Sequence, residues 1–156
     1  MFSIAQRPLP EIVNRQNKTT TMVFAKFNPQ TAILESKIEG KITVKELMEC
    51  SISLKKNETY PRFLKILIDS KKGIANFPSN DLSLLAEEYH KVVEKYDSVI
   101  TAIILDTPKE TAFAMLFQSF IKDNTSKFQL FSTREAAISW LNNYTESNCK
   151  PVKNYI

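Results

Sequence analysis

The stretch Val99–Leu105, with the sequence VITAIIL, decides the fold class of this chain. Every residue in it except Thr101 is apolar and most are β-branched, a composition typical of strands. The stretch therefore predicts a central strand of a sheet. A second nearly continuous apolar run, Phe63–Ile68, has the length expected of a parallel strand that is covered on both faces.

Segments with helical periodicity alternate with these strands. Thr43 and Glu46 have the spacing of a capping box, in which the Thr hydroxyl and the Glu carboxylate each accept a hydrogen bond from a free amide at the helix start. This box predicts a helix over about residues 44–56. The same spacing recurs at Thr107 with Glu110 and at Ser132 with Glu135. Apolar residues continue at helical intervals after these two boxes, and also between Leu82 and Tyr96.

The remaining strands complete the order of elements. Thr20–Phe27 and Ala32–Ile38 are rich in β-forming residues, and the turn-forming residues Asn28–Thr31 separate them, so an antiparallel hairpin is predicted. Lys127–Phe131 is a last short strand. The resulting order, ββαβαβαβα, predicts an α/β fold with a small, mostly parallel sheet and an antiparallel N-terminal hairpin.

Length and composition predict one domain. The 156 residues are 43% hydrophobic and 24% charged, which suits a chain with one hydrophobic core. We expect a loosely held lead-in over residues 1–18, a domain over 19–145 and a polar tail over 146–156. No secretion signal is recognisable, and no apolar run approaches the roughly 20 residues that span a bilayer. A cytoplasmic protein without an integral membrane segment is therefore expected.

Several classes of site do not fit the sequence. The formal charge is +4, but the basic residues are scattered, so nucleic acid is not an expected partner. Gly40 and Gly73 are the two glycines of the chain, too few for a glycine-rich phosphate loop. Cys50 and Cys149 lack the spacing of a zinc site or a redox dithiol. No cofactor and no metal are expected.

Polar residues at predicted strand ends and helix starts are the candidate ligand or regulatory site. Asp69 and Asp106 each follow a predicted strand, and ligands of open α/β sheets bind at the carboxyl ends of the strands. Thr107 and Ser79 lie where helices are expected to begin. Such residues more often end strands and cap helices than bind a ligand. A small metal-assisted enzyme at Asp69 and Asp106 is therefore the weaker alternative, and no catalytic residue is assigned.

The segment ETAFAMLFQSFI, residues 110–121, is apolar around much of the circumference of its predicted helix. Such a helix is either deeply buried or has a second apolar face for a partner or a lipid. Burial is the commoner outcome. The candidate partner surface consists of Phe113, Phe117 and Phe120.

Together these features resemble a known superfamily. The hairpin, the sequence Gly40–Thr43 leading into a helix, a strand reaching Asp69, and the closing FSTREAAISWL of residues 131–141 are similar to the SpoIIAA-like branch of the STAS domains (sulphate transporter and anti-sigma factor antagonist), often grouped with SEC14-like domains. The resemblance covers about residues 20–144. It implies a STAS-like α/β domain that is usually non-catalytic and acts through protein contacts or a small or lipidic ligand.

The resemblance also directs attention to a serine. Anti-sigma antagonists of the superfamily carry a phosphorylatable serine in an Asp-Ser-(Ser or Thr)-Gly-Leu string at a helix start. Here Asp69 and Ser70 are followed by two lysines, and Ser79 lies near the expected place without the adjacent glycine. The phosphoserine switch is therefore not transferred. We expect a non-enzymatic regulatory or ligand-binding module whose partner is an unknown protein or a second copy, with a hydrophobic small molecule or lipid as the alternative ligand.

Overall fold

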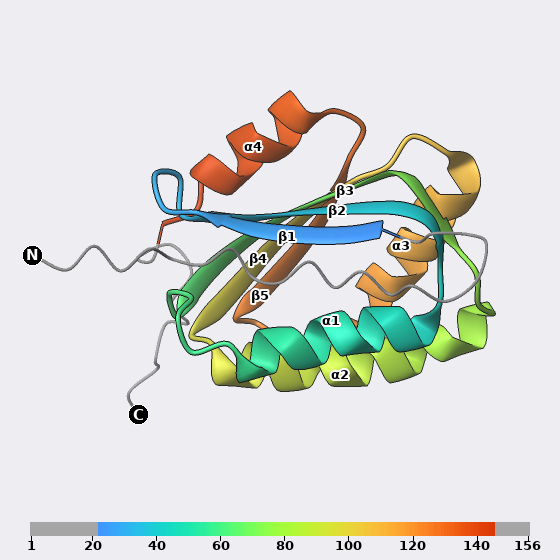
Figure 1. Ribbon diagram of the computed structural model, residues 1–156, viewed down its shortest axis with the longest axis horizontal. Helices are drawn as coiled ribbons and strands as arrows, with labels where there is room; N and C mark the ends of the chain where they lie inside the picture. Colours follow the sequence, from blue (N-terminus) through green and yellow to red (C-terminus); the bar gives the residue numbers. More distant parts are fainter. Residues whose placement is uncertain (1–21, 146–156) are drawn as a thin grey trace, which may run out of the picture.

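The order of the strands in the sheet follows their order in the sequence, β1-β2-β3-β4-β5 (Figure 1). The computed structural model describes residues 22–145, so the predicted lead-in and tail lie outside the described residues. The strands are β1 Met22–Asn28, β2 Ile33–Ile42, β3 Phe63–Ala75, β4 Ser98–Ile104 and β5 Ser126–Phe131. The helices are α1 Val44–Lys56, the short 3-10 helix η1 Ser79–Asp81, α2 Leu82–Lys95, α3 Pro108–Phe120 and α4 Arg134–Asn142.

Strand directions confirm the predicted architecture. β1 and β2 pair as an antiparallel hairpin, and β2 to β5 are parallel. The VITAIIL stretch forms β4, which pairs with β3 on one side and β5 on the other. Val99 and Thr101 on one face of β4 and Ile100 and Ala102 on the other are all at most 1% exposed, as expected for a strand covered on both faces.

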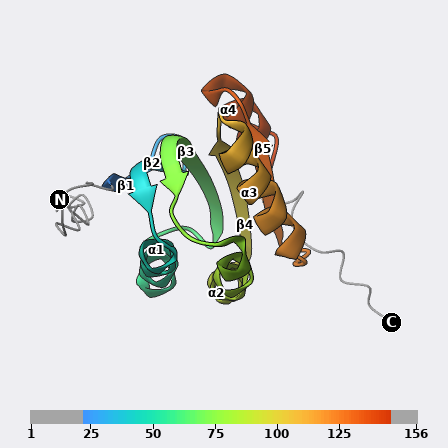
Figure 2. The ribbon, with the colours of Figure 1, turned by 90° about the vertical axis from the view of Figure 1, so that its right-hand side faces the viewer.

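The helices cover the two faces of the sheet unequally. From β2 to β5, each parallel strand lies directly beside the one before it, always on the same side. Because crossover connections between parallel strands are right-handed, the three crossover helices α1, α2 and α3 all lie on one face of the sheet. α4 follows the last strand and covers the other face (Figures 1 and 2). Two separate hydrophobic clusters result, one on each side of the sheet.

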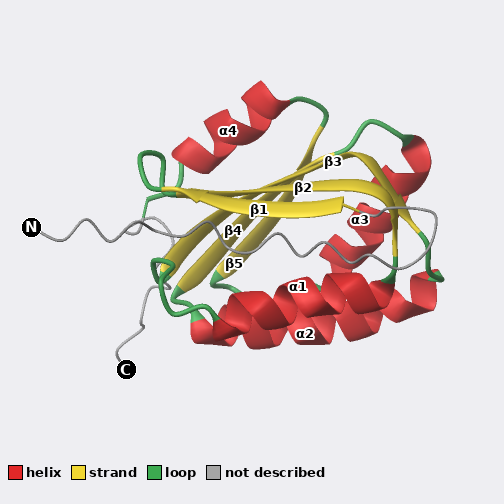
Figure 3. Cartoon of the chain, viewed as in Figure 1, coloured by secondary structure: helices red, strands yellow, loops and turns green. Residues whose placement is uncertain are grey.

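Strand β3 is longer than the predicted strand Phe63–Ile68. It pairs with β4 as far as Asp69, and beyond an irregularity at residues 70–71 its residues 72–75 pair with the end of β2 alone (Figure 3). We call this two-stranded extension, residues 39–42 of β2 with 70–75 of β3, the overhang. Because Lys71 and Lys72 are exposed, the overhang lacks the apolar run by which the first half of the strand was recognised.

Both glycines lie side by side in the overhang. Gly40 pairs with Gly73, and Gly40 has a positive φ of 83° that a side chain would strain. A Cβ at Gly73 would lie 2.6 Å from Ser70 Oγ and 3.0 Å from Ile38 Cγ2. The register also shifts between Lys37 and Glu39. A bulge and two glycines thus allow the ribbon to bend towards the start of α1 (Figure 1).

One of the three predicted capping boxes forms. At α1, Glu46 N donates to Thr43 Oγ1 at 3.2 Å, and Thr43 N donates to Glu46 Oε2 at 2.7 Å. At α4 the cap is Thr133, one residue later than predicted, and its Oγ1 accepts from Ala136 N. At α3 the Thr107 side chain makes no capping hydrogen bond.

Candidate functional site: a cavity between the sheet and helix α1

Helix α1 is the least buried of the helices that cover the sheet. Although all of its residues are described, not one of them is buried. Its apolar side faces a cavity of about 580 Å³ between the sheet and the three crossover helices. α1 contributes Leu47, Cys50 and Leu54 to the wall, and α2 contributes Leu82, Leu85 and Tyr89.

The rest of the wall comes from the sheet and from α3. Even-numbered residues of β2 and β3 face the cavity, among them Ile38 and Ile66, and Phe113 and Phe117 of α3 close it on the side of β5. Small polar side chains also line it: Ser36 of β2, Ser51 and Ser53 of α1, and Ser70 of β3. A larger apolar residue at these places would occupy part of the cavity.

The cavity contains one internal hydroxyl pair. Tyr89 Oη of α2 and Thr101 Oγ1 of β4 lie 3.2 Å apart and are hydrogen-bonded. The residues are 8% and 1% exposed, and both line the cavity. Burial raises the pKa of Tyr89 to about 12, so its hydroxyl stays protonated at neutral pH. Tyr60 also lines the cavity, and its buried hydroxyl has no hydrogen-bond partner among residues 22–145.

The cavity disfavours negative charge. Burial, followed by the nearby carboxylates Glu49 and Glu46, raises the pKa of Cys50 from 9.0 to about 11. Two charged residues occur among the described lining residues, Lys26 and Glu110. Lys26 is exposed on the edge strand β1, and the Glu110 carboxylate is already hydrogen-bonded.

Glu110 attaches α3 to the overhang. Its Oε2 accepts a hydrogen bond, 3.0 Å long, from the backbone N of Ala75, which is the last residue of β3. The carboxylate predicted to complete a capping box with Thr107 therefore bonds a backbone amide far away in the sequence. Because Ser70 and Gly73 of the overhang also line the cavity, this bond holds one end wall in place.

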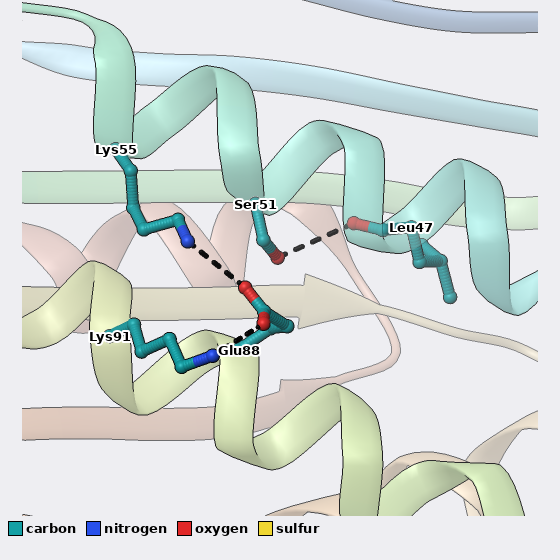
Figure 4. A network of polar contacts seen from close by, with 5 residues as sticks. All are labelled: Leu47, Ser51, Lys55, Glu88 and Lys91. Atoms are coloured by element: carbon teal, nitrogen blue, oxygen red, sulfur yellow. Dashed lines mark hydrogen bonds and ion pairs between the residues drawn. The ribbon is translucent and has the colours of Figure 1, made fainter.

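Polar contacts attach α1 to α2. Glu88 of α2 bridges Lys55 of α1, at 3.1 Å, and Lys91 of its own helix, at 2.8 Å (Figure 4). Hydrogen bonds to these lysines, first Lys91 and then Lys55, lower the pKa of Glu88. At the end of α1, Lys95 donates to the carbonyls of Lys55 and Asn57. α1 is therefore attached by its neighbour helix and by its N-terminal connection to β2, with the cavity beneath it.

The predicted strand-end site has a different geometry from the one expected. Asp69 lies inside β3 and not at its end; it pairs with Ile104, and its Oδ1 accepts from Lys71 N. Asp106 is exposed beyond the end of β4. The expectation that both acids end neighbouring strands was wrong for Asp69, because the strand continues into the overhang.

The predicted helix-start residues are both exposed. Thr107 precedes α3 and accepts hydrogen bonds at its carbonyl from the amide and hydroxyl of Thr111. Ser79 begins η1, and no side-chain hydrogen bond caps that turn. The structure thus does not bring Ser79 into contact with the cavity lining. His90 of α2 has a buried Nε2 without a hydrogen-bond partner in the described part of the chain.

The phenylalanines of α3 are directed into the domain. Phe117 is 9% exposed and packs edge-on against Tyr89 and Phe128. Phe113 and Phe120 are partly buried against the same cluster. The exposed apolar side chains of α3 are Met115 at 59% and Leu116 at 40%. The prediction that Phe117 belongs to a partner surface was wrong, because the small sheet and α2 are sufficient to bury its side chain.

Among residues 22–145, no three His, Cys, Asp or Glu side chains come together as a metal-binding group. Nor is any helix in this part of the chain both long and apolar enough to cross a bilayer.

The sequence did not predict the cavity. Its lining residues are ordinary core residues, and Ser36, Ser51, Ser53 and Ser70 follow no motif. The available signal was the inward position of small polar residues: Ser36 and Ser70 occupy the same face as the apolar residues of their strands. That face becomes recognisable only once the strand register is known.

Comparison with known proteins supports the fold. No family model matches the sequence, and no match to a curated protein is found. A crystal structure of an uncharacterised protein from the DUF3478 family, from Shewanella loihica, is similar to this structure with a TM-score of 0.52 and 18% sequence identity. The alignment covers 81% of this chain and 97% of that chain, which is described as having a SpoIIAA-like fold. The resemblance inferred from the sequence is confirmed at the level of the fold: the chain has a SpoIIAA-like α/β fold.

Proposed function

We propose that the domain is a binding module for an apolar small molecule or lipid, held in the cavity between α1 and the sheet. The main support for this proposal is the cavity, whose volume of about 580 Å³ lies within the range of small-molecule sites, about 300–1,000 Å³. Its walls are mostly aliphatic and aromatic, with a few hydroxyl groups. This favours the ligand-binding alternative over a module that acts through protein contacts alone.

Energetics support the same conclusion. The cavity is partly open, so water can enter it, but its mostly apolar walls offer that water few hydrogen-bond partners. An apolar ligand would displace this water and cover the walls.

The experiment is a binding titration with diphenylhexatriene, an uncharged fluorescent hydrocarbon, on the full chain. We expect saturable binding that Ser36→Leu weakens at least tenfold, because the new side chain fills the cavity. Ser36→Leu should not lower the free energy of unfolding, since it adds apolar contacts. Ser36→Ala, which adds no volume, and Lys37→Leu, on the neighbouring exposed position, are matched controls that should bind normally. Wild-type protein that shows no saturable binding would contradict the proposal.

A second candidate function is association with a protein, favoured by the exposed Met115 and Leu116 of α3. Sedimentation equilibrium of the wild type and of Leu116→Lys tests the case of a second copy. A dimer that the variant dissociates would support it. A monomeric wild type at all accessible concentrations would exclude self-association through this helix.

A further inference from the structure

We propose, on the basis of the ligand binding suggested above, that the ligand is an uncharged apolar molecule with one hydrogen-bond acceptor, which the hydroxyl pair of Tyr89 and Thr101 binds. A long-chain alcohol or ketone has this chemistry. A fatty-acid anion does not.

The hydroxyl pair has one hydrogen-bond donor to spare. Each hydroxyl carries one hydrogen, and the bond between Tyr89 Oη and Thr101 Oγ1 uses one of the two. Among residues 22–145 the structure shows no acceptor for the second hydrogen. Both residues are more than nine-tenths buried and line the cavity. Because a buried donor without an acceptor is costly, the pair is a favourable position for the polar atom of a ligand.

The surroundings determine the charge of that atom. The burial that raises the pKa values of Tyr89 and Cys50 would equally penalise a carboxylate in the cavity. No described lining residue can neutralise it at the hydroxyl pair: Lys26 lies exposed on the edge strand, and Glu110 is itself negative. A neutral acceptor such as a hydroxyl or carbonyl oxygen satisfies the donor without this penalty.

The position of the pair limits the shape of the ligand. Thr101 lies in β4 and Tyr89 in α2, whereas Ser36 lies two strands away in β2 and Leu47 in α1. The acceptor therefore binds between β4 and α2, and the apolar body extends beneath α1 towards β2. A ligand with its polar atom at one end can accept the hydrogen bond of the hydroxyl pair and still place its apolar body against the apolar walls.

The test measures how 1-decanol and decanoate displace diphenylhexatriene at pH 8, where decanoate is ionised. We expect decanol to compete at least tenfold more strongly. The double variant Tyr89→Phe/Thr101→Val removes both hydroxyl hydrogens and preserves the side-chain shapes. It should weaken decanol about five- to tenfold, the usual worth of one hydrogen bond, and leave binding of the hydrocarbon within twofold. Each single variant keeps one hydroxyl hydrogen that no longer bonds within the pair, so it should weaken decanol less than the double variant.

Tyr60 is the rival position, because its buried hydroxyl also lines the cavity and has no hydrogen-bond partner among residues 22–145. Tyr60→Phe should leave decanol affinity unchanged, and a loss of decanol affinity there instead of in the double variant would overturn the assignment to the pair. Circular dichroism confirms that each variant is folded. Equal competition by decanol and decanoate, or undiminished decanol affinity in the double variant, would overturn the ligand class while cavity binding stands. Failure of the hydrocarbon itself to bind wild-type protein would refute the proposed function, and the ligand class with it.

Discussion

Helices α4 and α1 cover opposite faces of the sheet and are packed in opposite ways. On one face α4 places Ala137 and Leu141 directly against Ile100 and Ile104, and all four residues are 0% exposed. On the other face α1 spans a cavity and has no buried side chain. Both helices carry a hydroxyl cap at Thr and an apolar side. The difference thus lies in what each helix packs against, and not in the helices themselves.

This contrast suggests a division of roles. The closely packed face of α4 contributes to specifying the fold, since dense packing gives both stability and a unique arrangement. Beneath α1 the packing is less dense and leaves the volume of the cavity, which lowers the stability contributed by this helix. The polar contacts of α1 with α2 lie at the C-terminal end of α1, at Lys55 and Asn57, so the rest of the helix can move without disrupting a core. The predictions below compare these two faces.

The largest effect is expected from a matched pair of leucine truncations. Leu141→Ala on α4 should lower the free energy of unfolding by about 3 kcal/mol, because it leaves a void in a closed core. Leu47→Ala on α1 should cost about 1 kcal/mol or less, because that side chain already borders the cavity. Urea denaturation measures both. Equal losses would show that the two faces are packed alike.

The reactivity of the Cys50 thiol measures how firmly α1 covers the sheet. Its pKa of about 11, against the ordinary 9.0, makes the thiolate fraction at pH 8 about a hundredfold smaller. In a Cys149→Ala background, we expect iodoacetamide to modify Cys50 correspondingly slowly and the rate to keep rising up to about pH 11. The same variant unfolded in urea should react at the ordinary rate. An ordinary rate in the folded protein would mean that α1 separates from the sheet readily.

The end wall of the cavity depends on Glu110. Glu110→Ala removes the acceptor for Ala75 N and should lower the free energy of unfolding by about 1 kcal/mol, reduced from the value for a buried charged hydrogen bond because the site is partly exposed. Glu110→Gln retains an amide oxygen and serves as the control. Thermal unfolding compares the three proteins. If both variants lose the same amount, the charge and not the hydrogen bond is responsible.

The smallest effect concerns the bridge between α1 and α2. Because its pKa is lowered in the folded protein, Glu88 stabilises the fold above the ordinary carboxyl pKa, and this contribution is lost as the pH falls through the lower, folded value. Glu88→Gln should therefore be slightly less stable than wild type at pH 7 and equal to it near pH 2. Urea denaturation at both pH values measures this. A difference that persists at pH 2 would point to packing instead of charge.

Local patterns predicted most of the elements correctly. The apolar run at β4, the capping box of Thr43 and Glu46, and the hairpin turn after β1 each act within a few residues, and each formed. The second half of β3 was missed because its pairing partner is β2, some thirty residues earlier, and its lysines are exposed. The capping role predicted for Glu110 failed because an amide of the overhang lies within its reach.

The sequence by itself determined the type and order of the elements, because helical periodicity, strand composition and caps are properties of short segments. The tertiary structure alone decided which face each helix covers and how far α1 lies from the sheet. That distance depends on the bent overhang of β2 and β3 and on the contacts of α1 with α2, which bring together residues far apart in the chain. The cavity is the consequence, and with it the ligand that we propose.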